Sequence, residues 1–101
     1  MVTFGMNYDV RPGAEARFEQ VVNEVLGLLG SVAGHRETRL YRDVHRPSGY
    51  LIYSEWETRE GFTGFTHSPT FQRVLTMGQD LLLGPPVHHT YRQVDDGPGP
   101  V

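Results

Sequence analysis

Apolar residues occupy every second position over residues 2–10, and the positions between them are polar or glycine. Because successive side chains of a β-strand point to opposite faces, this alternation predicts a strand with one face in a hydrophobic core. The residues Arg11, Pro12 and Gly13 follow directly. Their turn chemistry predicts that the strand ends there.

Two longer stretches carry apolar residues every three or four positions, the spacing of an amphipathic helix. In the first stretch, which starts at Ala14, these residues are Phe18, Val21, Val22, Val25, Leu28, Leu29 and Val32. In the second stretch, which starts at Pro69, they are Phe71, Val74, Leu75, Leu81 and Leu82. Ser68 suits the N-cap of the second helix, and Pro69 suits its first position, where a missing N–H donor costs nothing.

Three further strands complete the pattern. Residues 36–44 alternate weakly and predict a rather polar strand, and the turn over 45–49 leads from it into residues 50–57, which are rich in aromatic and branched side chains. Thr58 is the expected N-cap of a short helix that precedes the second long one. Residues 87–94 predict the last strand.

This order of elements predicts an α+β fold of the ferredoxin-like βαββαβ type, a four-stranded antiparallel sheet with its helices on one face. Residues 1–94 are expected to form this single domain, and residues 95–101, rich in Asp, Gly and Pro, are expected to be a disordered tail. Tyr41, Leu51 and Tyr53 then lie on the uncovered sheet face. A second copy of the chain is expected to cover that face, which makes the protein a homodimer.

The composition narrows the partners and the compartment. The chain of 101 residues has 38% hydrophobic residues and a formal net charge of -3, so it has no field that attracts nucleic acid or anionic lipid, and neither is expected as a partner. It lacks cysteine, which excludes disulfides and thiolate chemistry. The first residues lack the layout of a signal peptide and no apolar run reaches membrane-spanning length, so the cytoplasm is the expected compartment.

Three parts of the sequence resemble the antibiotic biosynthesis monooxygenase family, whose members are dimeric α/β barrels. They are the turn at residues 11–13, the strand and helix start YLIYSEWETREGF, and the restart HSPTF that begins at His67. The strand that ends in Trp56 and the Ser-Pro-x-Phe restart are the most specific of these. The resemblance covers residues 2–94 and implies a homodimer with a pocket in each subunit between sheet and helices. It also implies either cofactor-independent oxidation of phenols or quinols, or haem binding and degradation.

The sequence disfavours the haem alternative. In the haem-degrading relatives a histidine on the second long helix ligates the iron, one turn after the Phe of the restart, and Leu75 holds that position here. Those relatives also use an asparagine on the helix-facing side of the first strand. Met6 occupies that place in this chain, whereas Asn7 points to the opposite face.

Two residues are the candidates for catalysis. Trp56 offers an indole N–H donor beside a large apolar surface and is expected to hydrogen-bond a substrate carbonyl or phenolate. Histidine is the side chain best suited to proton transfer near neutral pH, so His67 is expected to act as a base or proton relay. The competing interpretation is that Trp56 is a core aromatic and that His67 is a solvated residue at a helix corner.

Tyr8, Tyr50, Ser54, Phe62 and Phe71 are the candidates for substrate binding, because each falls on the expected inner side of the sheet or helices. They can equally be ordinary strand aromatics and core residues. His88 and His89 are neighbours in a strand, so they point to opposite faces and cannot chelate one ion. No metal site is expected, and His35 and His45 are expected next to turns, exposed to solvent.

The function expected from the sequence is cofactor-independent monooxygenation of a phenolic, quinol or anthrone-type aromatic compound by molecular oxygen. Such a substrate donates electrons to oxygen once it is deprotonated, so the protein need only bind it, move a proton and stabilise an oxyanion. No cofactor is expected. The alternatives are a binding or accessory domain without turnover and, disfavoured, a haem-binding protein.

Overall fold

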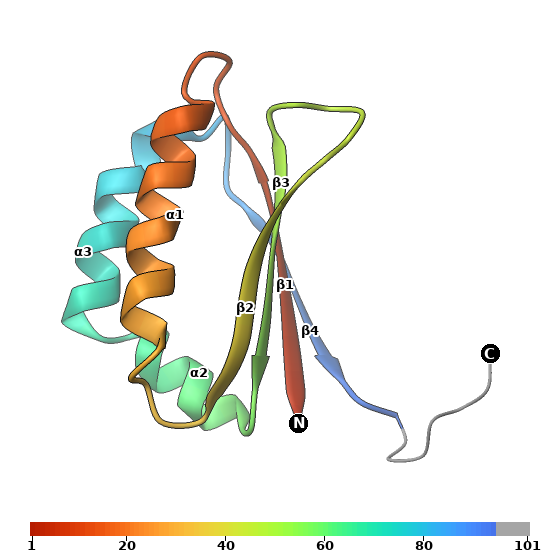
Figure 1. Cartoon of the computed structure of the whole chain (residues 1–101), viewed down its shortest axis with the longest axis vertical. Helices are drawn as coiled ribbons and strands as arrows, with labels where there is room; N and C mark the ends of the chain where they lie inside the picture. Colours follow the sequence, from red (N-terminus) through yellow and green to blue (C-terminus); the bar gives the residue numbers. More distant parts are fainter. Residues whose placement is uncertain (95–101) are drawn as a thin grey trace.

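The computed structural model describes residues 1–94, and the tail expected over residues 95–101 lies outside the described residues. The chain forms a four-stranded antiparallel sheet in the order β2-β3-β1-β4. All the helices lie on one face of this sheet (Figure 1). The elements are β1 (Val2–Asp9), α1 (Glu15–Leu29), β2 (His35–Arg42), β3 (Gly49–Trp56), α2 (Arg59–Thr66), α3 (Pro69–Gly78), the short 3₁₀ helix η1 (Gln79–Leu81) and β4 (Val87–Arg92). The expected α+β, ferredoxin-like arrangement is confirmed.

The register of the strands sets which side chains face the helices. Phe4 lies opposite Ser54 on β3, and Met6 lies opposite Ile52. Because residues paired across antiparallel strands point to the same face, these side chains form the floor beneath the helices. Phe4, Met6, Leu29 and Trp56 are the buried members of one core cluster. The alternation at the start of the sequence therefore marks the core face correctly.

The helices begin where the sequence predicts. The Thr58 hydroxyl accepts a hydrogen bond from the backbone N–H of Gly61 at 3.1 Å, which caps α2. The Ser68 hydroxyl accepts one from Phe71 N–H at 3.2 Å, with Pro69 in the first turn of α3. The apolar stripe of α1 buries its side chains against the sheet at Phe18, Val21, Val22 and Leu29.

The other face of the sheet is uncovered in the single chain. Tyr41 lies opposite Leu51, and the Tyr53 backbone lies opposite Gly5, so these residues are on this open face as expected. Tyr91 belongs to the same face and is 55% exposed. A Cβ atom on Gly5 would lie 3.5 Å from the Tyr91 ring and 3.8 Å from Leu51, so both side chains pack over this glycine. The open face thus carries an aromatic and aliphatic surface.

One expectation about a histidine is wrong. His35 follows the turn as expected, but it is the first residue of β2 and is half-buried rather than solvated. The pairing of β2 with β3 shifts between His35 and Glu37, so Arg36 is an extra residue in a β-bulge. His35 therefore pairs with Trp56 and points to the helix side of the sheet.

None of the helices formed within residues 1–94 combines the length and the hydrophobicity of a membrane span.

Candidate functional site

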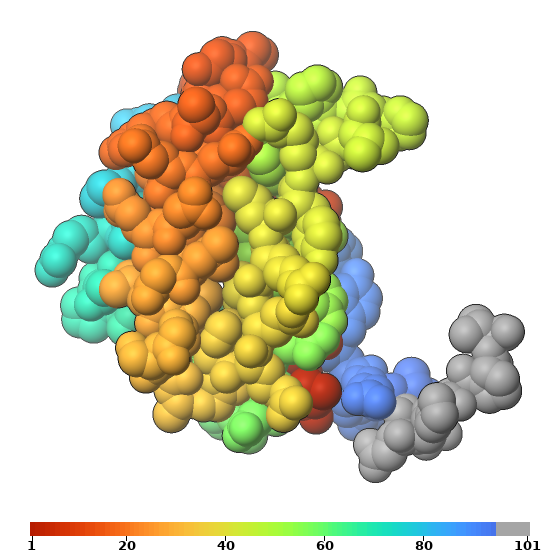
Figure 2. Space-filling view, viewed as in Figure 1, coloured from red at the N-terminus to blue at the C-terminus, as the bar shows by residue number. Residues whose placement is uncertain are grey.

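A cavity of about 100 Å³ lies between the sheet and the helical layer. On the face shown in Figure 2, the side chains of α1 (orange) lie beside those of β2 (yellow). Most of its wall is apolar. It is lined by Met6, Tyr8, Phe18, Val21, Val22, Val25, Leu29, Thr38, Ile52, Ser54, Trp56, Phe62, Phe65, Thr66, Phe71, Val74, Leu75, Gly78 and Leu82.

One corner of this cavity is polar and fully hydrogen-bonded. The Trp56 indole Nε1–H donates to Ser54 Oγ at 2.7 Å. Ser54 Oγ lies 2.7 Å from Thr38 Oγ1, which in turn lies 2.8 Å from His35 Nε2. We call these four residues the polar row. Three of them line the cavity, and the fourth, His35, is not on its wall.

The β-bulge explains how the polar row forms. Trp56, Ser54 and Thr38 share the helix-facing side of β3 and β2 through their register. With regular alternation, His35 would point the opposite way from Thr38, because the two positions are three apart, an odd number. The extra residue Arg36 reverses that parity and brings the His35 ring to the helix side, 5.1 Å from the Trp56 ring at an interplanar angle of 70°.

Burial sets the protonation of the groups at the site. It lowers the pKa of His35 from its ordinary value, so the neutral imidazole is the main form at pH 7. Burial also raises the pKa of Tyr8 to about 12, so the phenol stays protonated. The Tyr8 hydroxyl donates to Met6 Sδ at 3.8 Å, which is a weak hydrogen bond. The cavity wall is therefore uncharged near neutral pH.

Helix α2 closes the polar corner by packing on Trp56. The Trp56 ring contacts Phe62 with centroids 5.7 Å apart and Phe65 with centroids 5.9 Å apart. A Cβ atom on Gly61 would lie 3.3 Å from Trp56 Cε3, closer than most real contacts of that kind. Glycine at this position lets the helix approach the indole. Trp56 itself has no exposed surface.

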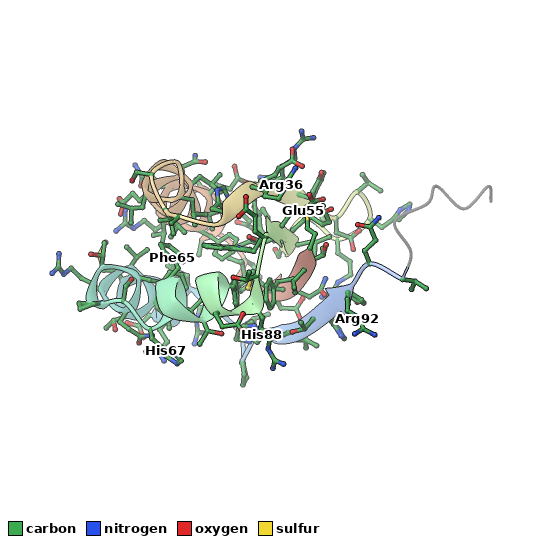
Figure 3. The ribbon with its side chains drawn as sticks, turned by 90° about the horizontal axis from the view of Figure 1, so that it is seen from below. Arg36, Glu55, Phe65, His67, His88 and Arg92 are labelled. Atoms are coloured by element: carbon green, nitrogen blue, oxygen red, sulfur yellow. The ribbon has the colours of Figure 1, made fainter. Side chains whose placement is uncertain are left out.

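The structure places five of the seven expected site residues on the cavity wall. These are Tyr8, Ser54, Trp56, Phe62 and Phe71. Tyr50 and His67 are not on that wall. The Tyr50 ring is buried, but its hydroxyl donates to Glu19 Oε2 at 2.6 Å on the outer side of the cavity. His67 is exposed at the end of α2 and points away from α1, whereas Phe65 lies on the side towards α1 (Figure 3).

Sequence reasoning missed Thr38 and His35. Thr38 could have been found, because it has the parity of Leu40 on the core face of the predicted strand. His35 carried no such signal, since its orientation depends on a bulge that the sequence pattern does not reveal.

Comparisons with known proteins agree with the fold described above. The family model described as "Antibiotic biosynthesis monooxygenase" matches residues 1–76. The chain belongs to the antibiotic biosynthesis monooxygenase family. Solved structures of this fold include SnoaB, a cofactor-independent oxygenase from Streptomyces nogalater, with a TM-score of 0.85, 23% identity and 96% of each chain covered. A conserved protein from Methanosarcina mazei has a TM-score of 0.87 at 14% identity, with 91% of each chain covered. At these identities the likeness shows the fold alone.

Curated relatives of this family member match most of this chain but only a small part of their own length. A protein from Natronomonas pharaonis is 33% identical over 86 residues, which are 85% of this chain and 14% of that protein. One from Halobacterium salinarum is 31% identical over 86 residues, which are 85% of this chain and 18% of that protein. Both carry heme-binding in their names. The chain spans less than a fifth of the length of these relatives.

The cavity of this antibiotic biosynthesis monooxygenase family member does not fit a haem. Its volume of about 100 Å³ is a small fraction of the roughly 300–1,000 Å³ of pockets that enclose ligands much larger than one aromatic ring. Its lining contains no histidine or cysteine, and Leu75 stands on the wall at the position expected for an iron ligand. Within residues 1–94, no three His, Cys, Asp or Glu side chains come together as a metal site. The residues present therefore do not form a haem pocket in this chain.

Proposed function

We propose that this protein is a monooxygenase that oxidises a single-ring phenol or hydroquinone with molecular oxygen and without a cofactor. The observation that carries this proposal is the polar corner of an otherwise apolar cavity, where two hydroxyl groups lie in line with a neutral histidine. An apolar wall holds an aromatic ring, and the hydroxyls meet its one polar atom. Membership of the family supports the same reaction class.

The size of the cavity narrows the substrate class. A dry cavity of about 150 Å³ lined by aliphatic and aromatic side chains holds benzene in another protein. The cavity of about 100 Å³ therefore accommodates one aromatic ring after small shifts of its lining side chains. A three-ring compound of the anthrone type is much larger. We accordingly narrow the expected substrate to a single ring.

The reaction balances without an added reductant. A phenol or hydroquinone with a free ortho position loses its hydroxyl proton, and the electron-rich ortho carbon forms a C–O bond with molecular oxygen. The proton returns to the distal oxygen, which lies beside the former phenolate oxygen, and gives a hydroperoxide. The O–O bond then breaks, the ortho C–H proton leaves with the distal hydroxide as water, and the ring becomes an ortho-quinone. One phenol and one O₂ give one quinone and one water, and the substrate supplies all the electrons.

The cavity residues divide this work. Ser54 accepts the N–H of Trp56 with one lone pair, which leaves its second lone pair and its proton for Thr38 and a ligand. Trp56 thus acts on the substrate by orienting Ser54, since its own donor is already used. Phe62, Phe71 and Leu75 enclose the ring of the ligand. The wall excludes water from the reactive phenolate.

Oxygen uptake with a panel of single-ring phenols and hydroquinones, without metal, flavin or nicotinamide, tests the proposal. We expect uptake by the wild type and a loss of about 100-fold or more in Ser54→Ala. Ser48→Ala is the matched control, because that serine donates to Glu15 at 2.6 Å, apart from the cavity. Thermal stabilisation by these phenols without oxygen uptake would contradict the proposal and favour a binding domain.

We also propose that the open face of the sheet joins two copies in a homodimer. Leu51 and Tyr91 pack over Gly5 on this face, and Tyr41 is 46% exposed there. An apolar surface of this kind is stabilised when a second copy covers it. Sedimentation equilibrium should give twice the chain mass for the wild type and a monomer for Leu51→Glu. A monomeric wild type at micromolar concentration would contradict this proposal.

A further inference from the structure

We propose that His35 is the proton acceptor of the site and that it receives the substrate proton through Ser54 and Thr38. This inference rests on the proposed function and names the base that the function needs. The oxidation starts only when the phenol loses its proton. No Asp, Glu, His or Lys side chain is on the cavity wall, and the buried Tyr8 phenol is too weak an acid to be ionised. The base must therefore lie behind the wall.

The distances of the polar row make His35 that base. Ser54 Oγ and Thr38 Oγ1 are 2.7 Å apart, and Thr38 Oγ1 is 2.8 Å from His35 Nε2. Each separation is that of a normal hydrogen bond. His67, which the sequence suggested as a base, is exposed and points away from α1. A ligand in the cavity is thus connected to the His35 imidazole through two hydroxyl groups, with no charged side chain between them.

The donors and acceptors of the row can be arranged in two ways. In the first, Ser54 donates to Thr38, and Thr38 donates to the neutral imidazole at Nε2, so Ser54 accepts the hydroxyl of a bound phenol. In the second, the imidazolium Nε2–H donates to Thr38, Thr38 donates to Ser54, and Ser54 donates to the phenolate. Trp56 donates to Ser54 in both. Every lone pair and proton is used consistently in each arrangement.

One concerted shift of three protons converts the first arrangement into the second. The phenol proton moves to Ser54 Oγ, the Ser54 proton to Thr38 Oγ1 and the Thr38 proton to His35 Nε2. The products are a phenolate that accepts a hydrogen bond from Ser54 and an imidazolium at His35. The reverse shift returns the proton to the distal oxygen after O₂ has added. The row is restored at the end of the cycle, so atoms and charges balance.

The surroundings of His35 keep it ready to accept a proton. Burial alone accounts for the lowered pKa of its imidazole, without a contribution from any charged neighbour. The Trp56 ring packs against the His35 ring in an edge-to-face arrangement, with the two ring centroids 5.1 Å apart. The charged side chains on the neighbouring segments are exposed or lie on the open face: Arg36, Glu37, Glu55, Glu57, Arg59 and Glu60. Half-burial leaves the imidazole able to exchange its proton with solvent.

Binding of 4-nitrophenol tests the inference without turnover. This single-ring phenol ionises near neutral pH, and only its phenolate is yellow. We expect the apparent pKa of bound 4-nitrophenol to be about one unit lower in the wild type than in Thr38→Val. At a given pH this is a tenfold higher ratio of bound phenolate to bound phenol in the wild type. Thr38→Val keeps the side-chain shape but breaks the row between Ser54 and His35. Thr38→Ser restores the hydroxyl and should restore the wild-type value.

The outcomes separate this inference from the proposed function. An ionised fraction that is equal in wild type and Thr38→Val, or that Thr38→Ser fails to restore, would overturn the role of His35 even if oxygen uptake persists. Ionisation that depends on Thr38 in a protein without oxygen uptake would support the relay and overturn the monooxygenase. No binding of 4-nitrophenol by folded wild-type protein would overturn both. His67→Gln, at the exposed histidine, should bind and ionise the ligand as the wild type does.

Discussion

Two hydrogen-bonded groups stand at opposite ends of the β2–β3 hairpin, and they differ in charge and burial. The polar row consists of uncharged groups, three of which are on the cavity wall. The other group, which we call the outer polar cluster, is formed by Glu15, Glu19, Arg42, Ser48 and Tyr50. It ties α1 to the hairpin at the surface, where the Arg42 and Glu19 side chains are 52% and 36% exposed.

The difference follows from the cost of burying charge. Ionised groups at the surface keep most of their hydration, so a salt bridge there contributes little to stability. Inside, an ionised group without partners would cost several kcal/mol, whereas hydroxyl and indole groups cost little once they are hydrogen-bonded. Charged groups therefore hold α1 to the hairpin at the surface, whereas neutral groups form the polar corner of the cavity, where a ligand can bind. Mutations in the two groups should consequently differ in how much stability they remove and in whether they reduce oxygen uptake.

The largest effect is expected for Ser54→Ala. Removal of the hydroxyl leaves the buried Trp56 N–H without its acceptor and interrupts the polar row. The free energy of unfolding should fall by about 1–3 kcal/mol, the usual cost of an unsatisfied buried group. Urea denaturation measures this change, and oxygen uptake measures the loss of activity. A variant as stable and as active as wild type would show that the row is not a functional unit.

A smaller effect is expected for Tyr50→Phe in the outer polar cluster. The Tyr50 hydroxyl donates to Glu19 at 2.6 Å and accepts from Arg42 Nη2 at 3.2 Å, close to the surface. Water replaces these partners, so the free energy of unfolding should fall by no more than about 1 kcal/mol. Oxygen uptake should stay at the wild-type level. A large loss of uptake would erase the distinction between the two groups.

The smallest effect is the acid dependence that the outer polar cluster adds. The Tyr50 hydroxyl first, and then Arg42, hold the pKa of Glu19 below its ordinary value. A carboxyl with a lowered folded-state pKa stabilises the protein at neutral pH, and this stability is lost as the pH falls through the ordinary value to the lowered one. Glu19→Gln should flatten the decline of the free energy of unfolding with acid. Urea denaturation at several acidic pH values measures the slope, and an unchanged slope would contradict this role.

The fold could be predicted from local patterns because they agree with one another. The alternation over residues 2–10, the two amphipathic stripes and the caps at Thr58 and Ser68 all reappear in the structure. Each depends on contacts within one element or on the parity of side chains. Ser54 and Trp56 were placed on the same face for the same reason, and their direct hydrogen bond follows from it.

The rest of the site depends on features that the alternation of side chains along a strand does not predict. A single bulge at Arg36 turns His35 to the helix side. Tyr50 has the expected parity, but its hydroxyl extends past the cavity to Glu19. His67 is the C-cap residue of α2, so its direction relative to α1 depends on the tertiary packing of that helix. Most residues of the cavity wall could therefore be predicted from the sequence, whereas the positions of His35, the Tyr50 hydroxyl and His67 could not.

A crystal structure of the protein soaked with phenol tests the central claim most directly. We predict a single phenol in the cavity beneath Trp56, with its ring against Phe62 and its oxygen within hydrogen-bonding distance of Ser54 Oγ. A phenol bound elsewhere, or a cavity that the protein's own side chains fill, would contradict the account.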